Sequence, residues 1–463
     1  MDNNVPPTPP PLPARPSLIA GLFRSPGGRL ALIGLLLFLL MIPVQMIRGV
    51  VQERADRRDE AAAGIVASWG GAQRLLGPVL RVPFKWRQPG TDEKGRPITN
   101  FYDDAAYLLP RDLKIEATLG TQLLRRGMFE VPVYQAGLVL RGHFVEPDLS
   151  RWNAQPEDID WQAAELIVSL SEPRALQADA GLEWNGKALR FRPSTGSGRI
   201  GKLPGIHAPL GEAGRGLFSK GEAVFTIALK ARGAQQLSFA PTAEETTVSL
   251  RSDWPHPSFQ GEWLPSSRQI GDSGSSADWS VSWLGRDYPQ LWRETHAVDE
   301  TRLQAGFGIG LQVPVDPYML AERISKYALL ILVCSFAVIW LTELLSGRRV
   351  HAIQYGFVGA GLCLFGLLQL SVAEHFGFSL AYAVAAIAVT LMVTLYSRSL
   401  LGGWRALAVG GVLAGLYGYL YTILQAEDYA LLGGTVALFL GLALAMYLTR
   451  NFNWASPPGR GDD

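Results

Sequence analysis

The feature that most constrains this chain is a set of apolar stretches, each long enough to cross a lipid bilayer. A hydrocarbon core about 30 Å thick needs about 20 apolar residues in a helix. Six stretches approach that length, at 30–47, 327–345, 350–370, 376–396, 406–424 and 429–448. The first stretch is longer than the usual signal-peptide core, and no A-x-A-like site follows it closely. The pattern therefore predicts a membrane protein with a retained N-terminal anchor and a C-terminal bundle of five transmembrane helices.

The arginines in the short connections predict which side of the membrane each connection faces. Short loops rich in Lys and Arg stay in the cytoplasm. The arginines lie in alternate connections and after the last span, at Arg348, Arg349, Arg398, Arg405 and Arg450. The other two connections, "EHFG" at 374–377 and "QAED" at 425–428, contain neither Lys nor Arg. The flanks of the first span are ambiguous, so the later loops decide. We expect both termini in the cytoplasm and residues 49–326 outside the membrane.

This orientation divides the chain into five predicted segments. They are a Pro-rich, disordered cytoplasmic tail (1–28), an anchor (29–48), an exported domain (49–326), a five-helix bundle (327–449) and a cytoplasmic tail (450–463). The exported segment has 278 residues and ten of the thirteen tryptophans, enough to bury a core of its own.

The exported segment alternates apolar and polar residues in the way that half-buried β-strands do. The alternating apolar positions are Leu113/Ile115/Ala117/Leu119, Phe225/Ile227/Leu229, Leu138/Leu140, Leu166/Val168/Leu170, Leu189/Phe191, Val248/Leu250 and Trp279/Val281/Trp283. Turns containing Gly and Pro separate these runs, with no long helical pattern between them. We therefore predict a β-rich domain, an antiparallel sandwich or barrel-like fold, of unspecified strand order.

A charged segment, "QERADRRDE", directly follows the first span. Glu53 precedes Arg57 by four positions, a spacing that supports an exposed helix. One interpretation is a solvated extension of the span, since interspersed charges usually mark a solvated face. The other is a juxtamembrane stalk that sets the height and orientation of the exported domain. The two interpretations are compatible.

Catalytic and metal-binding patterns are absent from the sequence. The exported histidines, His143, His207, His256 and His296, have no second ligand at metal spacing, and no hydrolase, P-loop or dinucleotide motif occurs. Cys334 and Cys363 lie in predicted spans, which leaves the exported domain without a disulfide. The net charge of +1 gives no field to attract nucleic acid. We expect no enzyme activity, no cofactor, no metal and no nucleic-acid partner.

The stretch "SDWPHPSFQGEWLP", residues 252–265, is the most unusual part of the exported segment. Prolines restrict the residues before them to extended conformations, and rigid loops that display aromatic rings can form recognition surfaces. The candidate recognition residues are Trp254, His256, Phe259 and Trp263. The alternative is that the three aromatic rings close one end of the β core.

Polar residues of the bundle form two further groups of candidates, because ionisable groups near spans are costly and often functional. Glu374, His375, Glu427 and Asp428 fall in the two outer connections and form a candidate rim that couples domain to bundle or binds a ligand. Glu343, Gln354 and Gln369 are the candidate intramembrane polar groups; Glu343 is expected to pair with Arg348, Arg349 or His351. Gly411 with Gly415 and Gly356 with Ala360 predict close helix contacts.

Several segments together resemble the CreD family of inner-membrane proteins, which is associated with cell envelope integrity. The similar segments are "ERADRRDEAAAGI", "GPVLRVPF", "SDWPHPSFQGEWLP", "DPYMLAERISKYALLIL", "HAIQYGFVGAGLCLFGLLQLSVAEHFGF", "AEDYALLGGTVALF" and "MYLTRNFNW". Ala352 stands where the family pattern has proline, and the Pro-rich tail is atypical. The resemblance implies a bacterial inner-membrane location and a role in envelope stress, and it supplies neither a reaction nor an active site.

Two functions from different classes follow as hypotheses. In the first, the exported domain binds an envelope component or a periplasmic or membrane protein, and the bundle holds it at the membrane. In the second, the bundle moves a lipid or small solute, and Glu343, Gln354 and Gln369 line one path. Membrane lipids are partners in either case. An envelope hydrolase would be a third class, and no motif supports it.

Overall fold

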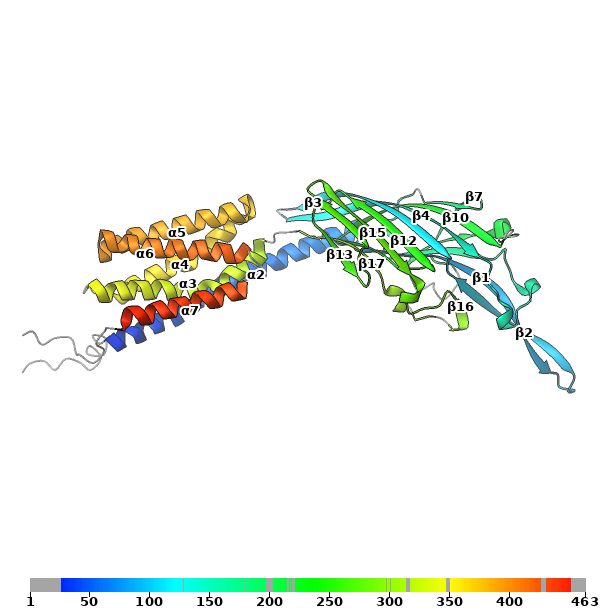
Figure 1. Cartoon of the computed structure of the whole chain (residues 1–463), viewed down its shortest axis with the longest axis horizontal. Coiled ribbons are helices and arrows are strands. Elements are labelled where there is room, and N and C mark those ends of the chain that lie inside the picture. Colours follow the sequence, from blue (N-terminus) through cyan, green and yellow to red (C-terminus); the bar gives the residue numbers. More distant parts are fainter. Residues whose placement is uncertain are drawn as a thin grey trace, which may run out of the picture. The chain divides into compact units, whose positions relative to one another are not determined.

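The computed structural model describes residues 26–450 except 128, 179, 197–202, 215, 217, 219–220, 297, 300, 314–316, 347–349 and 426–429. The predicted tails at 1–28 and 450–463 lie almost wholly outside these residues. The chain divides into two compact units. Residues 1–57 and 315–463 form the helical unit, and residues 58–314 form the β domain. Figure 1 shows the course of the chain through both units.

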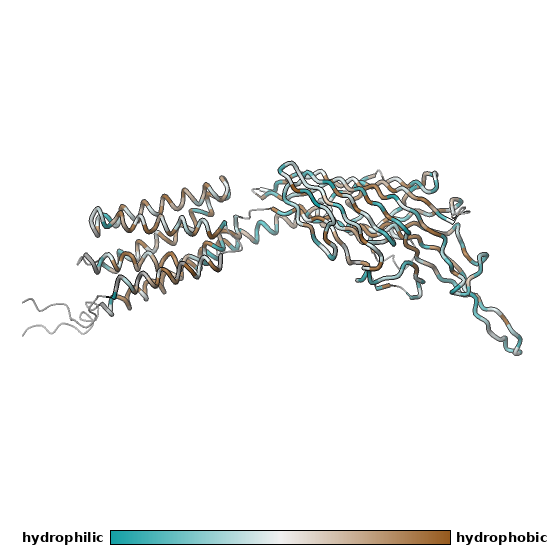
Figure 2. Tube along the Cα trace, viewed as in Figure 1, coloured by the Kyte–Doolittle hydropathy of each residue, from teal (hydrophilic) through white to brown (hydrophobic). Residues whose placement is uncertain are grey.

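The helical unit contains the predicted anchor and the predicted bundle. Its helices are α2 (Pro26–Trp69), α3 (Pro317–Ser346), α4 (Ala352–Phe376), α5 (Phe378–Leu401), α6 (Gly403–Gln425) and α7 (Ala430–Thr449). Helices α2 to α6 are long and apolar enough to cross a membrane, and α7 adds the apolar stretch Leu432–Ala443. Hydrophobic residues accordingly dominate these helices (Figure 2). The helical membrane part expected from the sequence is confirmed.

Two helices extend beyond their predicted apolar cores. Helix α3 begins at Pro317, ten residues before the predicted span at 327, because polar "ERISK" interrupts the hydropathy but not the helix. Helix α2 continues to Trp69 and includes the charged segment after the first span. The expected pair of Glu53 and Arg57 forms there, with 2.6 Å between carboxylate and guanidinium. Residues 26–57 of α2 belong to the helical unit and 58–69 to the β domain.

The β domain is built from two sheets. The first sheet has the order β13-β17-β11-β1-β5-β9-β8, with β2 paired to β1 and β16 paired to β2. Its strands are β13 (Pro257–Gly261), β17 (Phe307–Leu311), β11 (Gln236–Phe239), β1 (Gln73–Thr91), β5 (Glu165–Leu170), β9 (Gly205–Pro209), β8 (Arg192–Pro193), β2 (Pro97–Leu108) and β16 (Leu291–Arg293).

The second sheet has the order β14-β15-β12-β3-β4-β10-β6-β7. Its strands are β14 (Ser267–Gly271), β15 (Gly274–Ser282), β12 (Glu245–Ser252), β3 (Asp112–Arg126), β4 (Phe129–Val145), β10 (Glu222–Ala234), β6 (Gly181–Trp184) and β7 (Lys187–Arg190). Short 3-10 helices connect strands in both sheets, at Ser150–Trp152, Pro156–Asp158, Pro173–Ala175, Gly211–Gly214, Trp283–Gly285, Glu294–His296 and Arg302–Gln304.

The predicted β-rich domain is confirmed, and its sheets are mixed. Most pairs are antiparallel, but β1 runs parallel to β11 and β3 runs parallel to β12. One continuous core draws residues from both sheets, including Leu80 of the first and Leu140 of the second. Along β3 the burial alternates residue by residue, as its sequence predicts. Strand β5 is buried on both faces, so the side chains of its apolar run pack on either side of the sheet.

Two predicted strand ends are wrong. Phe191 lies beyond the end of β7, and Trp283 begins a 3-10 helix after β15. The sequence-based list also lacks β1, which is the longest strand, and β2, because β1 carries a continuous apolar run and β2 is exposed along its first half. Period-two patterning does not detect strands of either kind.

Candidate functional site

A buried carboxylate joins three helices at one end of the helical unit. Glu343 of α3, whose side chain is 6% exposed, forms an ion pair with Arg29 of α2. The hydroxyl of Tyr355 on α4 donates a hydrogen bond to the second oxygen of Glu343, at 3.0 Å. We call these three residues the Glu343 cluster. A charge so placed is tolerated in a membrane bundle because it is paired and hydrogen-bonded.

A second carboxylate joins the same three helices at the other end of α4. Glu374 has a side chain that is 10% exposed and lies 3.9 Å from the guanidinium of Arg54 on α2. The hydroxyl of Tyr318 on α3 donates to Glu374 at 3.1 Å. We call these residues the Glu374 cluster. At 3.9 Å the ion pair is looser than a direct hydrogen bond, so the Tyr318 contact is the better defined of the two.

The two clusters share one arrangement. Each has a glutamate from α3 or α4, a tyrosine from the other of these helices and an arginine from α2. Arg29 and Arg54 are 25 residues apart, which in a helix is about 37 Å. This separation slightly exceeds the hydrocarbon thickness of about 30 Å. The clusters therefore suit the two membrane interfaces, and they fasten α2 to α3 and α4 at both.

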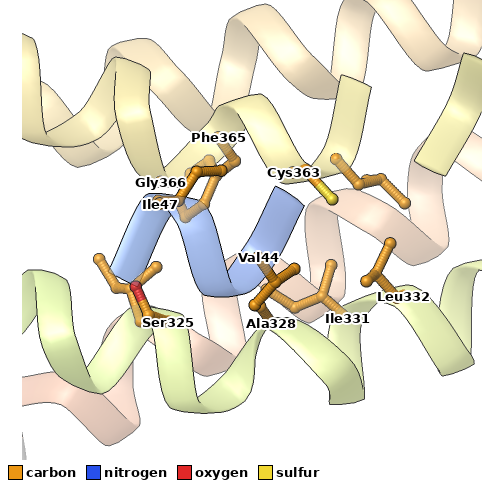
Figure 3. A pocket seen from close by; sticks show the side chains of 11 residues that line it. Val44, Ile47, Ser325, Ala328, Ile331, Leu332, Cys363, Phe365 and Gly366 are labelled. Carbon is orange, nitrogen blue, oxygen red and sulfur yellow. The ribbon is translucent and has the colours of Figure 1, made fainter. Parts of the chain in front are cut away.

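Between the clusters, α2 packs directly against its two neighbours. Gly359 of α4 faces Leu40 of α2, and a β-carbon at position 359 would overlap that leucine. The guanidinium of Arg48 donates to the carbonyl of Ser325 on α3 at 3.2 Å. A cavity of about 20 Å³ remains between α2, α3 and α4, lined by residues such as Val44, Ile47 and Cys363 (Figure 3). A space of this size holds about one water molecule, so the packing is close.

The close contacts fall at other glycines than the sequence predicts. Among the described residues, a β-carbon at Gly356, Gly411 or Gly415 would meet no atom within 4 Å. The expectation of tight contacts at these glycines is wrong. Gly359 fills that role, because the face of α4 that meets α2 is set by tertiary packing and not by a small-xxx-small spacing alone.

The three predicted intramembrane polar groups do not lie together. Glu343 forms an ion pair with Arg29, which was not among its expected partners; Arg348 and Arg349 lie outside the described residues, so a pairing with either stays a prediction. Gln354 caps α4, since its amide oxygen accepts from the His351 N–H at 2.8 Å. Gln369 is fully buried, and neither amide atom has a hydrogen-bond partner among the described residues. None of the three lines the cavity of Figure 3.

The candidate rim is only partly described. Glu374 forms its cluster, while His375 is exposed in the last turn of α4. Glu427 and Asp428 lie outside the described residues. The partners of Glu374 come from α2 and α3, and a rim of four residues stays a prediction.

The candidate recognition residues divide into packed rings and an exposed histidine. Trp254, Phe259 and Trp263 are partly buried against the core of the β domain, while His256 is exposed. The Trp254 indole also donates to the carbonyl of Gln312 at 3.0 Å. These contacts favour the interpretation in which the rings close one end of the core.

Exposed apolar residues lie on two neighbouring loops beside these rings. Leu264 is 73% exposed, Trp283 44% and Leu284 81%. The two loops are adjacent, since the indole nitrogen of Trp263 would lie 3.5 Å from a β-carbon added at Gly285. We call Leu264, Trp283 and Leu284 the apolar loop patch. The sequence analysis did not single it out, because exposure of single apolar residues carries no periodic signal.

The last turns of α2 are part of the β domain. Ala62, Ile65, Val66 and Trp69 pack against a small core of Val131, Val133 and Ala234. The Trp69 indole donates to the Tyr134 carbonyl at 3.2 Å, and the Arg232 guanidinium lies 4.8 Å from the Trp69 ring. Helix α2 is thus fastened in both units by side chains of its own.

The sequence analysis identified both glutamates but missed their partners. Arg29, Arg54, Tyr318 and Tyr355 were not candidates. The sequence does contain a signal for the two arginines. Arg29 and Arg54 flank the first span, and their separation matches the distance between the two membrane interfaces. Within the described residues, no group of three His, Cys, Asp or Glu side chains is arranged to hold a metal ion.

Comparison with known proteins places this arrangement in a family. The model of the family "Inner membrane protein CreD" matches residues 25–455. This chain belongs to the CreD family. A relative, the inner membrane protein CreD of Escherichia coli K12, is 32% identical over 422 residues, which cover 90% of this chain and 91% of that protein. The match therefore includes all six described helices and the whole β domain. The CreD resemblance read from the sequence is confirmed.

The comparison with solved structures adds nothing to the CreD assignment. An M1 zinc metallopeptidase from Deinococcus radiodurans covers 76% of this chain and 95% of its own, at 9% identity and a TM-score of 0.23. A likeness this low carries no argument about fold or activity.

Proposed function

We propose that this CreD-family protein supports the integrity of the bacterial cell envelope by binding a periplasmic or membrane protein through its β domain, without catalysis. The β domain faces the periplasm in this proposal, and both termini lie in the cytoplasm. The helical unit holds the β domain at the inner membrane through α2. An envelope-stress role fits the same arrangement.

The observation that carries the proposal is the double fastening of α2. Its arginines pair with Glu343 and Glu374 in the helical unit, and its last turns pack into the β domain core. Glu343 of α3 and Glu374 of α4 are thereby used to hold a helix. They do not line the cavity between α2, α3 and α4, as a solute path through that part of the bundle would require.

The surface we propose for the protein partner is the apolar loop patch. Large exposed apolar residues beside partly buried tryptophans have the composition of a binding hot spot. Replacing Leu264 and Leu284 with Asp should remove partner binding and leave the fold intact, because both side chains are largely exposed. A matched control is Val224→Asp, since Val224 is 55% exposed on β10, away from the two loops.

The test measures envelope permeability in cells that lack the protein, by dye entry and survival in detergent or a β-lactam. Cells receive the full chain, the Leu264→Asp/Leu284→Asp chain, or a chimera of residues 1–316 followed by one unrelated transmembrane helix. We expect the chimera to restore the barrier and the double variant to fail. A chimera that is made, protease-resistant and inert would assign the function to the helical unit instead. Full restoration by the double variant would reject the apolar loop patch.

A further inference from the structure

The hairpin of β1 and β2 projects from the β domain (Figure 1). Its outer part contains seven residue pairs, which run from Lys85 opposite Asp103 to the tip. Among the described strands, neither β5 on one side nor β16 on the other extends to these pairs. We call residues 85–91 and 97–103 the β arm, which is about 20 Å long. An isolated two-stranded ribbon has little stability in water, so the β arm needs support at its base.

Side chains on both faces hold the base of the β arm. The Arg293 guanidinium lies 5.0 Å from the Trp86 ring, and that ring stacks on Tyr102 with 4.9 Å between the centroids. Arg87, the next residue, points to the opposite face and donates to the Asp158 carboxylate at 2.7 Å. The β arm is therefore held in one geometry without a partner, which lowers the entropic cost of binding at its edges.

Two hydrogen bonds show which main-chain groups point away from the hairpin. The N–H of Arg87 in β1 donates to the Asn153 carbonyl at 3.0 Å. The N–H of Leu109, which directly follows β2, donates to the Gln290 carbonyl beside β16, also at 3.0 Å. Successive residues of an antiparallel ladder direct these groups to opposite sides, and the register of β1 with β2 is uninterrupted. The odd-numbered residues of both strands therefore direct their N–H and C=O groups outward.

The two outer edges of the β arm differ. On the β1 side, the Arg87 N–H is already bound, and the next outward residue, Pro89, has no N–H. On the β2 side, the outward residues are Thr99, Phe101 and Asp103, and no described residue hydrogen-bonds to their main-chain groups. We call these three residues the open edge of β2. Folded proteins often protect such an edge with Lys or Pro, and none of the three is either.

The chemistry of the open edge specifies an extended polypeptide. Outward N–H and C=O groups recur at every second residue, a spacing that another β-strand matches along its length. Phe101 is 55% exposed, Asp103 is also exposed, and the two side chains lie on one face of the β arm. Across a ladder, aromatic rings pair well with apolar side chains and carboxylates with basic ones.

We propose that the open edge of β2 binds an extended strand of another protein by antiparallel pairing. This strand carries an apolar residue opposite Phe101 and Lys or Arg opposite Asp103. The β arm is then a second protein-binding surface, which goes beyond the apolar loop patch and does not depend on it.

A second copy of this chain fits the open edge less well than another protein does. Two β2 strands would have to pair through their outward residues. Pairing Phe101 with its counterpart sets Thr99 opposite Asp103, and pairing Asp103 with its counterpart brings like charges together. No register supplies a basic residue, since β2 contains neither Lys nor Arg.

The experiment uses a labelled, capped peptide, Ser-Lys-Thr-Val-Thr-Ile-Thr-Ser, whose Lys and Val match Asp103 and Phe101. Its binding to the purified full chain in detergent micelles is measured by fluorescence anisotropy. An N-methyl group on the Val removes a donor that faces β2, whereas one on the next Thr lies on the far side of the added strand. We expect the first to weaken binding about tenfold, because one hydrogen bond is lost, and the second to leave binding unchanged.

Variants of the chain test the same contact. Asp103→Lys should weaken binding several-fold, and a peptide with Glu in place of Lys should bind this variant better than it binds the original chain. Leu264→Asp/Leu284→Asp should bind the peptide normally, so this proposal and the apolar loop patch can fail separately. Equal binding of the two methylated peptides, or no binding of the unmethylated one, would overturn the proposal. A dimer that Thr99→Pro converts to monomer would also overturn it, in favour of a second copy at the open edge.

Discussion

At the scale of single residues, Glu343 and Glu374 show how a carboxylate is kept in a membrane bundle. Each receives a tyrosine hydroxyl and an arginine from other helices, so the cost of removing the charge from water is offset by contacts of both kinds. The pairs also differ, because Glu343 is in direct contact with Arg29 while Glu374 lies 3.9 Å from Arg54. Loss of Glu343 should therefore cost more than loss of Glu374.

We predict that Glu343→Gln lowers the free energy of unfolding by about 3 kcal/mol, because it leaves Arg29 without its counter-charge at a largely buried site. The measurement is a denaturation titration of the full chain in mixed detergent micelles. Glu322→Gln is the control, since Glu322 pairs with Lys326 at 2.8 Å on an exposed face. That pair should contribute less than about 1 kcal/mol. Equal losses in both variants would contradict a special role for Glu343.

Asp104 in the β domain gives a prediction with a defined pH dependence. Its side chain is 1% exposed and lies 2.6 Å from the Arg293 guanidinium. Burial acts to raise the pKa of Asp104, but hydrogen bonds from Thr295 and the Ala105 N–H, together with Arg293, hold that pKa below its usual value. A lowered folded-state pKa stabilises the fold above the unfolded-state pKa of about 3.9, and this stabilisation is lost as pH falls below it.

We therefore predict that Asp104→Asn destabilises the β domain by about 3 kcal/mol at pH 7 and flattens the fall in stability between about pH 4 and pH 2. Thermal unfolding of the full chain across this range checks both effects. Asp287→Asn is the control, because Asp287 is 84% exposed and lies 3.5 Å from Arg302. If the original chain and Asp104→Asn lost stability in parallel on acidification, Asp104 would not be the source.

At the scale of elements, α2 depends on the absence of a side chain at Gly359. We predict that Gly359→Val displaces α2 from α4, because the new side chain would overlap Leu40, and overpacking costs about 1 to 3 kcal/mol. The measurement is the rate at which a disulfide forms between Ile47→Cys and Gly366→Cys, in a chain with Cys334 and Cys363 replaced by Ala. We expect Gly359→Val to slow this reaction. These two positions are close, because the Ile47 side chain would lie 3.6 Å from a β-carbon added at Gly366.

The matched control for that experiment is Gly356→Val, on the same helix. A β-carbon at 356 meets no atom of the described part of the chain within 4 Å, so this variant should form the disulfide as fast as the parent chain. Slower formation in both variants would mean that valine disturbs α4 itself. Unchanged formation in Gly359→Val would show that α2 does not need close approach at that glycine.

Elements with a strong local pattern were predictable from the sequence, and those set by distant partners were not. The apolar length of the spans predicts α4 to α6 closely, and alternation predicts β3 and β10, because both signals are local. The ion-pair partner Arg29 of Glu343 is not local, since it lies 314 residues away. The parallel pairing of β1 with β11 likewise depends on chain topology. Pairing across such separations leaves no periodic trace in one sequence.

At the scale of the whole molecule, the predicted orientation can be tested with single cysteines, because the chain has only two, both in helices of the helical unit. In a chain with Cys334 and Cys363 replaced by Ala, we expect a membrane-impermeant maleimide to label Ser267→Cys in intact spheroplasts. Ser17→Cys should be labelled only after lysis. The reverse pattern would place the β domain in the cytoplasm and reject a periplasmic partner.

The pairing of Arg29 with Glu343 also sets an order of events during biogenesis. Translation at about 5 to 20 residues per second makes Glu343 roughly 15 to 60 seconds after Arg29, given the 314 residues between them. Throughout that interval the first helix sits in the bilayer as a solitary segment with unmatched arginines at both ends. Its final docking must therefore follow synthesis of the β domain encoded in between. A ribosome that stalls before α3 would leave a product in which Arg29 and Arg54 lack the carboxylates of α3 and α4.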